Sequence, residues 1–540
     1  ADIKRYAGRR KRRLRAPDKY SIMMSKIGEW EMKTFAAIDV GSYELGMKIF
    51  EISSKNGIRE IDHIRHRIDL GSDTFATGKI SNERVDELCR VLREYGEIMK
   101  GYQVDDYKAY GTSAVRETEN TMIVLDQIKQ RTGIAIEVLS NSEQRFLDYK
   151  SIASGGDAFN KIIEKGTAIV DIGGGSIQIS LFDKDTLVTT QNMRLGVLRL
   201  QDQLGRLNIR PEQSESMLDE LVSSQLSVFK KLYLKDRVIE NIIVVDDYIS
   251  AVVGRNVAGL EHTSVESAAM DKFLERIRVK SVQDVAHILG MPEENVPLLF
   301  ISGVLLNRIA KVMDAKLIWA PGVSLCDGIA YEYGEKNKLI RERHDFEQDI
   351  IACARNISKR YMGSRRRSET LEQIALTIYD SMKKVHGLGK RERLLLRIAT
   401  LLHDCGKYIS LVNLGECSYN IIMSTEIIGL SHVEREIVAN VVKYNHIDFE
   451  YYEAMGRDSS LDRRDYLTIA KLTAILKIAN GLDRSHKQKF KNVRTTLKDE
   501  QLIITVDASL DITLEKGLFS KRAEFFEEVY SVRPVIRQKS

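Results

Sequence analysis

Two short stretches place an aspartate two residues before a glycine turn, and both could bind phosphate. Asp39 stands in "AIDVGS" and Asp171 in "VDIGGGS", each at the end of an apolar run. Glycine has no Cβ, so the backbone N–H groups of such a turn can point at one anion. An aspartate alone repels phosphate, but it can hold Mg²⁺ or a water that bridges to phosphate oxygens. The pair predicts a clamp for a polyphosphate or a nucleotide.

The elements around these turns repeat. Residues 34–52 are typical of strand, tight turn and strand, and residues 169–182 have the same layout. Superposition pairs Asp39 with Asp171 and Gly41 with Gly173, which predicts an internal duplication. Apolar positions at helical spacing predict a helix over 85–99. Further strands are expected at 107–112, 242–246 and 298–304.

Strands that alternate with helices favour an α/β fold. We predict two related lobes that face each other across a cleft, over residues 34–155 and 156–340. Long amphipathic patterns such as "ETLEQIALTIYDSM" then predict a helical domain over 341–487. Alternation returns in the last segment, so a small α/β subdomain is expected over 488–540.

Residues 1–33 form a basic extension that we expect to be disordered. Between Arg9 and Arg15, six of seven residues are basic. Such a run is typical of a solvated tail, and it could also hold phosphate polymers, nucleic acid or an acidic membrane face.

The composition of the 540 residues is that of a globular protein, with 43% hydrophobic and 29% charged residues and a net charge of +5. The five cysteines form no CxxC pair, so free thiols are expected instead of disulfides or a thiolate zinc site. We recognise no apolar run that would span a bilayer and no signal peptide. The expected location is the cytoplasm, with no membrane partner and no specific nucleic acid.

Five phrases resemble one known family when taken in order: "AIDVGS", "GTSAVRE", "VDIGGGS", "LGVLRL" and "ISGVLLN". They are similar to those of exopolyphosphatases and guanosine pentaphosphate phosphohydrolases (the Ppx/GppA family). The resemblance covers residues 34–335 and continues into a helical HD-type domain. It implies two actin-like lobes of the ribonuclease-H-like (ASKHA) class, a homodimer, and a substrate of linked phosphates trimmed from its end by water.

The resemblance also implies roles for single residues. Asp39 and Asp171 match the positions that hold the metal, expected to be Mg²⁺ or Mn²⁺. Arg116, in the segment with Thr112 and Ser113, can form a bidentate pair with phosphate. The alternative for Arg116 is a structural salt bridge. The phosphate loops match Gly41, Ser42, Gly173, Gly174, Gly175 and Ser176.

The chain departs from the family where catalysis requires a carboxylate to orient water and accept its proton. The family stretch Ser-Gly-x-Glu-Glu-Ala-Arg corresponds to "SNSEQRF", which puts Gln144 at the catalytic glutamate. Gln178 likewise replaces a carboxylate expected near the metal. Glu143 and Glu117 are the candidate replacement bases.

Two further departures concern charge. Tyr43 and Glu44 stand where many members have Asn-Ser. Asp246 and Asp247 occupy a loop that usually carries Gly-Thr, and they would repel phosphate unless a cation intervened.

The helical domain contains "LLHDCGK", which resembles the metal site of HD phosphohydrolases. His403, Asp404 and Asp483 match three ligands, whereas the upstream ligand position falls on Arg367. Cys417 and Asn445 also stand where members often carry histidine. An arginine opposes a divalent metal, so a degenerate, structural site is favoured over an active one.

Three functions stay open on the sequence. The leading one is an exopolyphosphatase-like phosphohydrolase that removes terminal phosphate from polyphosphate or guanosine pentaphosphate. Gln144, Gln178 and Arg367 motivate the second, a pseudoenzyme that binds polyphosphate or guanosine polyphosphates as a regulator. A sugar-kinase-like ATPase on the same fold is the third.

Overall fold

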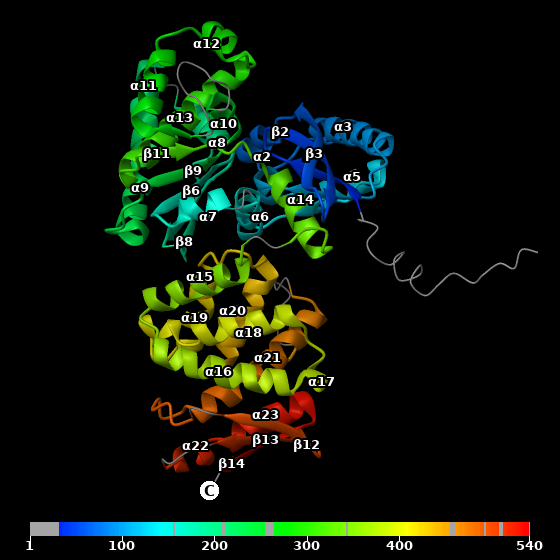
Figure 1. Cartoon of the computed structure of the whole chain (residues 1–540), viewed down its shortest axis with the longest axis vertical. Coiled ribbons are helices and arrows are strands. Elements are labelled where there is room, and N and C mark those ends of the chain that lie inside the picture. The colour runs from blue at the N-terminus through cyan, green and yellow to red at the C-terminus, as the bar shows by residue number, and fades with distance from the viewer. Residues whose placement is uncertain are drawn as a thin grey trace, which may run out of the picture.

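The computed structural model describes residues 32–538 except 155–156, 185, 208–210, 254–263, 342–343, 454–460, 491–492 and 507–510. Two α/β lobes lie side by side, the helical domain lies below them, and a small α/β subdomain ends the chain at the opposite pole (Figure 1). The predicted basic run at 9–15 is outside the described residues.

The first lobe is built on a five-stranded sheet with the order β3-β2-β1-β4-β5. A long helix from Asn82 to Gly101 covers it and buries the apolar positions of the predicted helix. Ser81 caps this helix, and its side chain accepts from the Arg84 N–H. The elements are β1 (Lys33–Val40), β2 (Glu44–Ser53), β3 (Gly57–Arg67), α2 (Leu70–Thr77), α3 (Asn82–Gly101), β4 (Asp106–Gly111), α4 (Ser113–Glu117), α5 (Thr121–Thr132) and β5 (Glu137–Val138).

The second lobe contains a six-stranded sheet with the order β10-β11-β9-β6-β7-β8. Its strands are β6 (Thr167–Ile172), β7 (Ile177–Asp183), β8 (Thr186–Met193), β9 (Asn241–Val245), β10 (Ser264–Glu266) and β11 (Leu317–Trp319). Its helices are α7 (Asp157–Ile163), α8 (Val197–Arg206), α9 (Pro211–Phe229), α10 (Asp247–Val253), α11 (Ser267–Arg278), α12 (Val282–Leu289) and α13 (Val296–Met313), with a π-helical turn at Lys230–Leu234.

The two sheets share one topology, which supports the predicted duplication. In each, the first three strands are antiparallel neighbours and the next two add in parallel on the other side, so β6, β7, β8, β9 and β11 correspond to β1 to β5. Asp39 pairs across its hairpin with Gly46, and Asp171 pairs with Gln178. The two aspartates therefore occupy equivalent places.

The strand predicted at 298–304 is wrong, because these residues lie inside helix α13. A short continuous apolar run fits a buried strand and a buried helix equally well. Pro297 in the first turn favours the helix. The segment Glu293–Met313 is also long and apolar enough to cross a membrane by length and composition, but 61% of its apolar 18-residue window is buried, as in a core helix.

Two helices join the lobes. Helix α6 (Asn141–Ala153) follows β5, and α14 (Leu325–Lys336) packs against it and against β1 and β2. Leu325 and Ile329 share a core with Phe35 and Phe50 of the first sheet. The predicted boundary at residue 340 placed α14 with the second lobe, whereas the helix returns to the first.

The helical domain comprises α15 (Phe346–Arg360), α16 (Arg365–Ser381), α17 (Lys383–His386), α18 (Lys390–Leu402), α19 (Leu414–Met423), α20 (His432–His446) and α21 (Arg463–Leu482). Helix α15 packs against β8, so the domain shares one hydrophobic core with the second lobe. The last elements are β12 (Arg494–Lys498), β13 (Gln501–Val506), α22 (Thr513–Gly517), α23 (Ser520–Tyr530) and β14 (Arg533–Gln538), an α/β subdomain as predicted.

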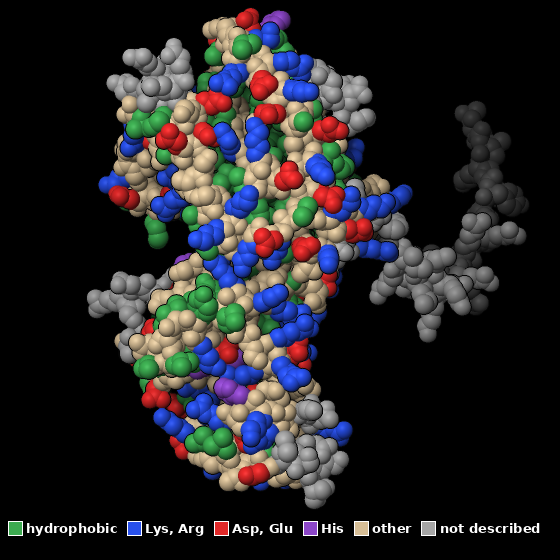
Figure 2. Space-filling model, turned by 90° about the vertical axis from the view of Figure 1, so that its left-hand side faces the viewer, with side chains coloured by type: hydrophobic (Ala, Val, Ile, Leu, Met, Phe, Trp, Pro, Cys, Tyr) green, Lys and Arg blue, Asp and Glu red, His purple; other side chains and the backbone are tan. Residues whose placement is uncertain are grey.

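Charges are mixed on the face shown in Figure 2. Lys and Arg side chains are interspersed with Asp and Glu side chains over the second lobe. Lys and Arg gather where the lobes meet the helical domain. All five cysteines are free thiols, as expected, and four of them are buried.

Candidate active site

The two glycine turns have the same backbone geometry. The Gly41 N–H donates to the Glu44 carbonyl at 3.0 Å, and the Gly173 N–H donates to the Ser176 carbonyl at 3.0 Å. Each bond lies at the same offset from its aspartate. A Cβ on Gly41 would lie 2.7 Å from the Glu44 oxygen, so only glycine fits there.

Hydrogen bonds within the second lobe hold its glycine turn in place, and packing brings the two turns close together. The N–H groups of Val197 and Leu198, at the start of α8, donate to the carbonyls of Gly173 and Gly174 at 3.0 Å. A Cβ on Gly174 would meet the Ser42 side chain at 3.0 Å, which shows how closely the two turns approach. The Ser42 and Ser113 hydroxyls lie 3.1 Å apart.

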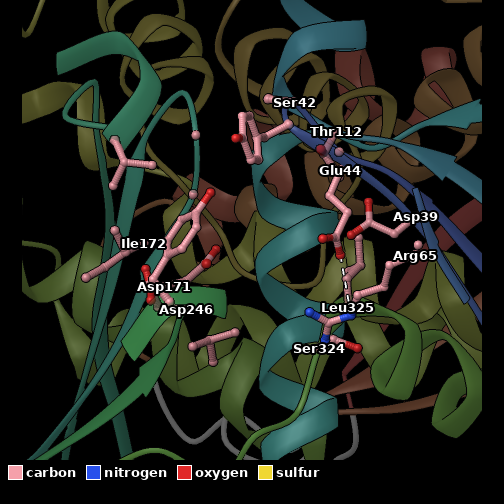
Figure 3. A pocket seen from close by; sticks show the side chains of 18 of the residues that line it. Asp39, Ser42, Glu44, Arg65, Thr112, Asp171, Ile172, Asp246, Ser324 and Leu325 are labelled. Carbon is pink, nitrogen blue, oxygen red and sulfur yellow. Dashed lines mark ion pairs between the residues drawn. The ribbon is translucent and has the colours of Figure 1, made fainter. Parts of the chain in front are cut away.

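A cavity of about 400 Å³ opens beside the turns, between the lobes (Figure 3). Asp171 and Asp246 come from the second lobe, while Asp39, Ser42 and Glu44 come from the first. The predicted residues that it brings together are Asp39, Gly41, Ser42, Thr112, Ser113, Gln144, Asp171, Gly173 and Gly174. Gly175, Ser176 and Arg116 are not among the lining residues.

The cavity is acidic. Five carboxylates line it, against the single guanidinium of Arg65, which pairs with Glu44 at 3.5 Å. His63 adds no charge at neutral pH, because burial lowers its pKa to about 4. The acidic residues are Asp39, Glu44, Asp148, Asp171 and Asp246. A phosphate chain would be repelled here unless cations accompanied it.

The donor set fits Mg²⁺ or Mn²⁺. Carboxylate oxygens are hard ligands, and Mg²⁺ commonly uses one or two of them together with water and phosphate oxygens. Among the residues described, no group of three or more His, Cys, Asp or Glu side chains is arranged to hold a metal ion by itself. An ion held by Asp39 or Asp171 would therefore complete its shell with water and substrate.

Asp148 is the site residue that the sequence reasoning missed. It lies on α6, one turn after Gln144, is 4% exposed, and lines the cavity. Burial, together with the nearby Asp171 and Asp39 carboxylates, raises the pKa of Asp148 well above its ordinary value. The spacing i, i+4 from Gln144 was the available signal, since such residues share a helix face.

Gln144 lines the cavity, and its amide oxygen also faces Arg116. Arg116 donates to it at 3.3 Å and to the Leu139 carbonyl at 2.8 Å. Arg116 itself lines a neighbouring cavity of about 490 Å³ between the first lobe and the helical domain. The prediction that Arg116 grips phosphate beside Asp39 and Asp171 thus finds no support in this geometry.

The two candidate bases lie outside the cavity. Glu143 closes a capping box at the start of α6, where its carboxylate accepts from the Ser140 N–H at 3.0 Å. Glu117 forms an ion pair with Arg199 at 2.6 Å. Both carboxylates are committed to structural contacts, so the structure does not place either beside the two turns.

Gln178 is not among the residues that line the cavity. Its amide oxygen accepts from the Arg145 guanidinium at 2.8 Å, and Arg145 is 3% exposed. Arg145 occupies the place of the alanine in the family stretch. Arg145 and Gln178 therefore form one buried pair, and neither residue lines the cavity.

Asp246 lines the cavity, and its carboxylate also accepts hydrogen bonds from two neighbouring helices. It accepts from the Ile249 N–H at 2.5 Å and from the Ser302 hydroxyl at 2.9 Å. Its two oxygens thus tie α10 to α13.

The second predicted cluster also assembles. His403, Asp404 and Asp483 lie together in the helical domain, with Arg367 between the two carboxylates. This site is separate from the interlobe cavity.

Known proteins that this chain resembles include ones named as guanosine pentaphosphate and polyphosphate phosphatases. Guanosine-5'-triphosphate,3'-diphosphate pyrophosphatase of Vibrio atlanticus is 20% identical over 497 residues, covering 89% of this chain and 92% of that protein. Exopolyphosphatase 1 of Mycobacterium tuberculosis is 25% identical over 144 residues, covering 26% and 40%. The crystal structure of an exopolyphosphatase from Cytophaga hutchinsonii matches with 19% identity and a TM-score of 0.49, covering 58% of this chain and 100% of that one.

Two family models cover most of the chain. The model of the Ppx/GppA phosphatase family matches residues 49–336, and that of Ppx/GppA phosphatase domain III matches residues 351–522. The first match alone spans more than half of the chain and contains the second aspartate turn. This chain belongs to the Ppx/GppA phosphatase family.

Proposed function

We propose that this chain removes terminal phosphate from inorganic polyphosphate or guanosine pentaphosphate, by Mg²⁺- or Mn²⁺-dependent attack of water in the interlobe cavity. The paired aspartate–glycine turns that meet at this acidic cavity carry the proposal. The relatives named for guanosine pentaphosphate and for polyphosphate support both substrates. We further propose that the chain acts as a cytoplasmic homodimer.

The backbone of the two turns binds the substrate. Gly41 and Gly173 keep the turns narrow, and free N–H groups of the turns donate to phosphate oxygens. Asp39 and Asp171 would hold the divalent ion, which would supply positive charge to offset that of the phosphates and carboxylates. The phosphate chain is thereby bound in spite of the five carboxylates.

Asp148 orients the attacking water. A group must face this water and accept its proton, and the Gln144 amide is not a base at neutral pH. Asp148 extends from the same face of α6, one turn further along, and reaches the cavity. A carboxylate moved by one helical turn thus replaces the catalytic glutamate of the family. This assignment rests on the position of Asp148 in the cavity.

The rival function is binding without turnover, which Gln144 specifically favours. An amide does not accept a proton at neutral pH, so a site that depends on position 144 would hold the ligand uncleaved. Ligand binding would still stabilise the folded chain by mass action.

One assay separates the two functions. Phosphate release from long-chain polyphosphate and from guanosine pentaphosphate is followed with Mg²⁺ or Mn²⁺, and binding is measured in parallel. We expect release that Asp171→Asn abolishes. Binding of either ligand without release under both metals would establish the rival function.

Two substitutions on α6 then test which residue supplies the carboxylate that activates the water. Asp148→Asn should lower the rate of release by roughly 10²-fold or more, because a positioned acid or base contributes about that much. Gln144→Glu should change the rate by less than tenfold. Asp183→Asn, at the exposed end of β7, is the matched control and should leave the rate unchanged. New or sharply higher turnover with Gln144→Glu would instead show that position 144 limits catalysis.

A further inference from the structure

The centre of the helical domain holds a buried cluster of charges. Arg367 enters it from the first turn of α16, Asp404 from the end of α18, and Asp483 from the end of α21. The Arg367 Nε lies 3.6 Å from Asp483 Oδ2, and one terminal nitrogen lies 3.8 Å from Asp404 Oδ2. The other donates to the Asn480 amide oxygen at 2.8 Å. The guanidinium thus lies between two carboxylates that come from different helices.

All three charged side chains are removed from water. Arg367 is 4% exposed, Asp404 6% and Asp483 1%. An isolated carboxylate in such a place is costly, so each needs a positive partner. Arg367 is permanently charged and its planar fork can face both carboxylates at once.

The charges in the cluster already balance. Lys407 lies 3.2 Å from Asp404 Oδ2, so two cations face two carboxylates. His403 Nδ1 donates to the Thr400 carbonyl at 2.8 Å. A divalent ion would add two positive charges to a balanced, buried site beside an arginine.

Atoms that could bind a metal ion nevertheless surround Arg367. His403 Nε2, Asp404 Oδ1 and Asp483 Oδ2 are buried and have no hydrogen-bond partner among the described residues, and the same holds for Arg367 Nε. With Nδ1 donating to a carbonyl, Nε2 carries the lone pair that a metal would use. One imidazole nitrogen and two carboxylates therefore surround the guanidinium instead of an ion.

We propose that the Arg367 guanidinium takes the place of a divalent metal ion in the helical domain, as an internal cation that joins α16, α18 and α21. The domain is then a metal-free structural unit, and any hydrolysis by this chain takes place between the lobes. A single change, Arg367→His, would remove the cation, supply a fourth ligand and convert the cluster into a metal site.

Metal content tests this proposal without reference to activity. The full-length chain and its variants are dialysed against Co²⁺, and bound metal per chain is measured. Arg367→His should bind one more ion than the unmodified chain, and adding Asp404→Asn should remove it. Arg367→Met is the matched control: it lacks both the charge and a nitrogen ligand, and it should gain no ion. Equal metal content in Arg367→His and Arg367→Met would overturn the proposal.

A second comparison remains informative if Arg367→His does not fold. The unmodified chain and its Asp483→Asn variant should bind the same amount of Co²⁺, since any ion in the chain lies between the lobes. Loss of one ion from Asp483→Asn would show that the helical domain binds metal despite Arg367 and would refute the proposal. Arg367→Met should lower the Tm by roughly 5–10 °C, because two buried carboxylates lose their shared cation.

Discussion

Gly196 offers a direct test of the phosphate turn. It precedes α8 and packs under the second glycine turn with φ −68° and ψ 152°, a conformation open to alanine. A Cβ at this position would lie 2.2 Å from the Gly175 carbonyl carbon, 2.3 Å from the Gly174 oxygen and 2.3 Å from the Ser176 nitrogen. All three atoms belong to the backbone, so no side chain can move aside.

The displacement follows from these distances. Carbon atoms in contact rest at roughly 3.5 Å, so Gly196→Ala must push the turn back by about 1 Å. Misplacing a catalytic group by about 1 Å can lower the rate roughly 10²-fold. Overpacking of this kind also costs roughly 1–3 kcal/mol of stability. We therefore expect a folded variant that releases phosphate about a hundred times more slowly and binds polyphosphate more weakly.

Gly205→Ala is the matched control in the same helix. A Cβ on Gly205 meets nothing within 4 Å, and alanine is the better helix former by roughly 0.5–1 kcal/mol, so turnover should be unchanged and the Tm equal or higher. Initial rates, polyphosphate affinity and Tm are measured for both variants. If Gly196→Ala folds and keeps its rate and affinity within threefold of the unmodified chain, the turn does not hold the substrate and the proposed geometry is refuted.

Three further predictions concern stability and can be checked by unfolding experiments. Burial of Lys477 lowers its pKa from 10.5 to about 8, so the unfolded chain binds more protons between these values, and stability should rise with pH from about 8 to 10.5. Lys477→Met should lose this rise, and an unchanged slope would refute the assignment. Tyr149→Phe removes a 2.6 Å hydrogen bond to the buried Asp349 and should cost roughly 1.5–3 kcal/mol. Tyr102→Phe, which removes an exposed bond to an aspartate, should cost far less. Ser431→Ala removes the cap of α20 and should cost about 1 kcal/mol; no loss would show that the capping box is dispensable.

Local chemistry made much of the site predictable. Asp39 and Asp171 stand at strand ends before glycine turns, and the hydrogen bond that closes each turn lies within these few residues. The duplication, the α/β lobes and the helical domain could be read from strand and helix periodicity along the chain. The grouping of His403, Asp404 and Asp483 was implied only by the resemblance to HD phosphohydrolases.

The sequence did not predict which hydrogen-bond and ion-pair partners the polar side chains would have. Glu143 and Glu117 have suitable chemistry for a catalytic site, but one caps a helix and the other pairs with Arg199. Asp148 lies outside the family stretch, and only its i, i+4 spacing from Gln144 indicated that it shares the face of α6 that lines the cavity. The apolar run at 298–304 suited a strand until the surrounding core favoured helix α13.

The sequence by itself therefore determined which residues could hold phosphate and metal, because turns and strand ends are set by neighbouring residues. The tertiary structure decided which carboxylates face the cavity and which are neutralised elsewhere, as Arg367 neutralises Asp404 and Asp483. The physical reason is that a buried charge is stabilised by whatever lies within a few ångströms of it, and in this fold those partners come from distant parts of the chain.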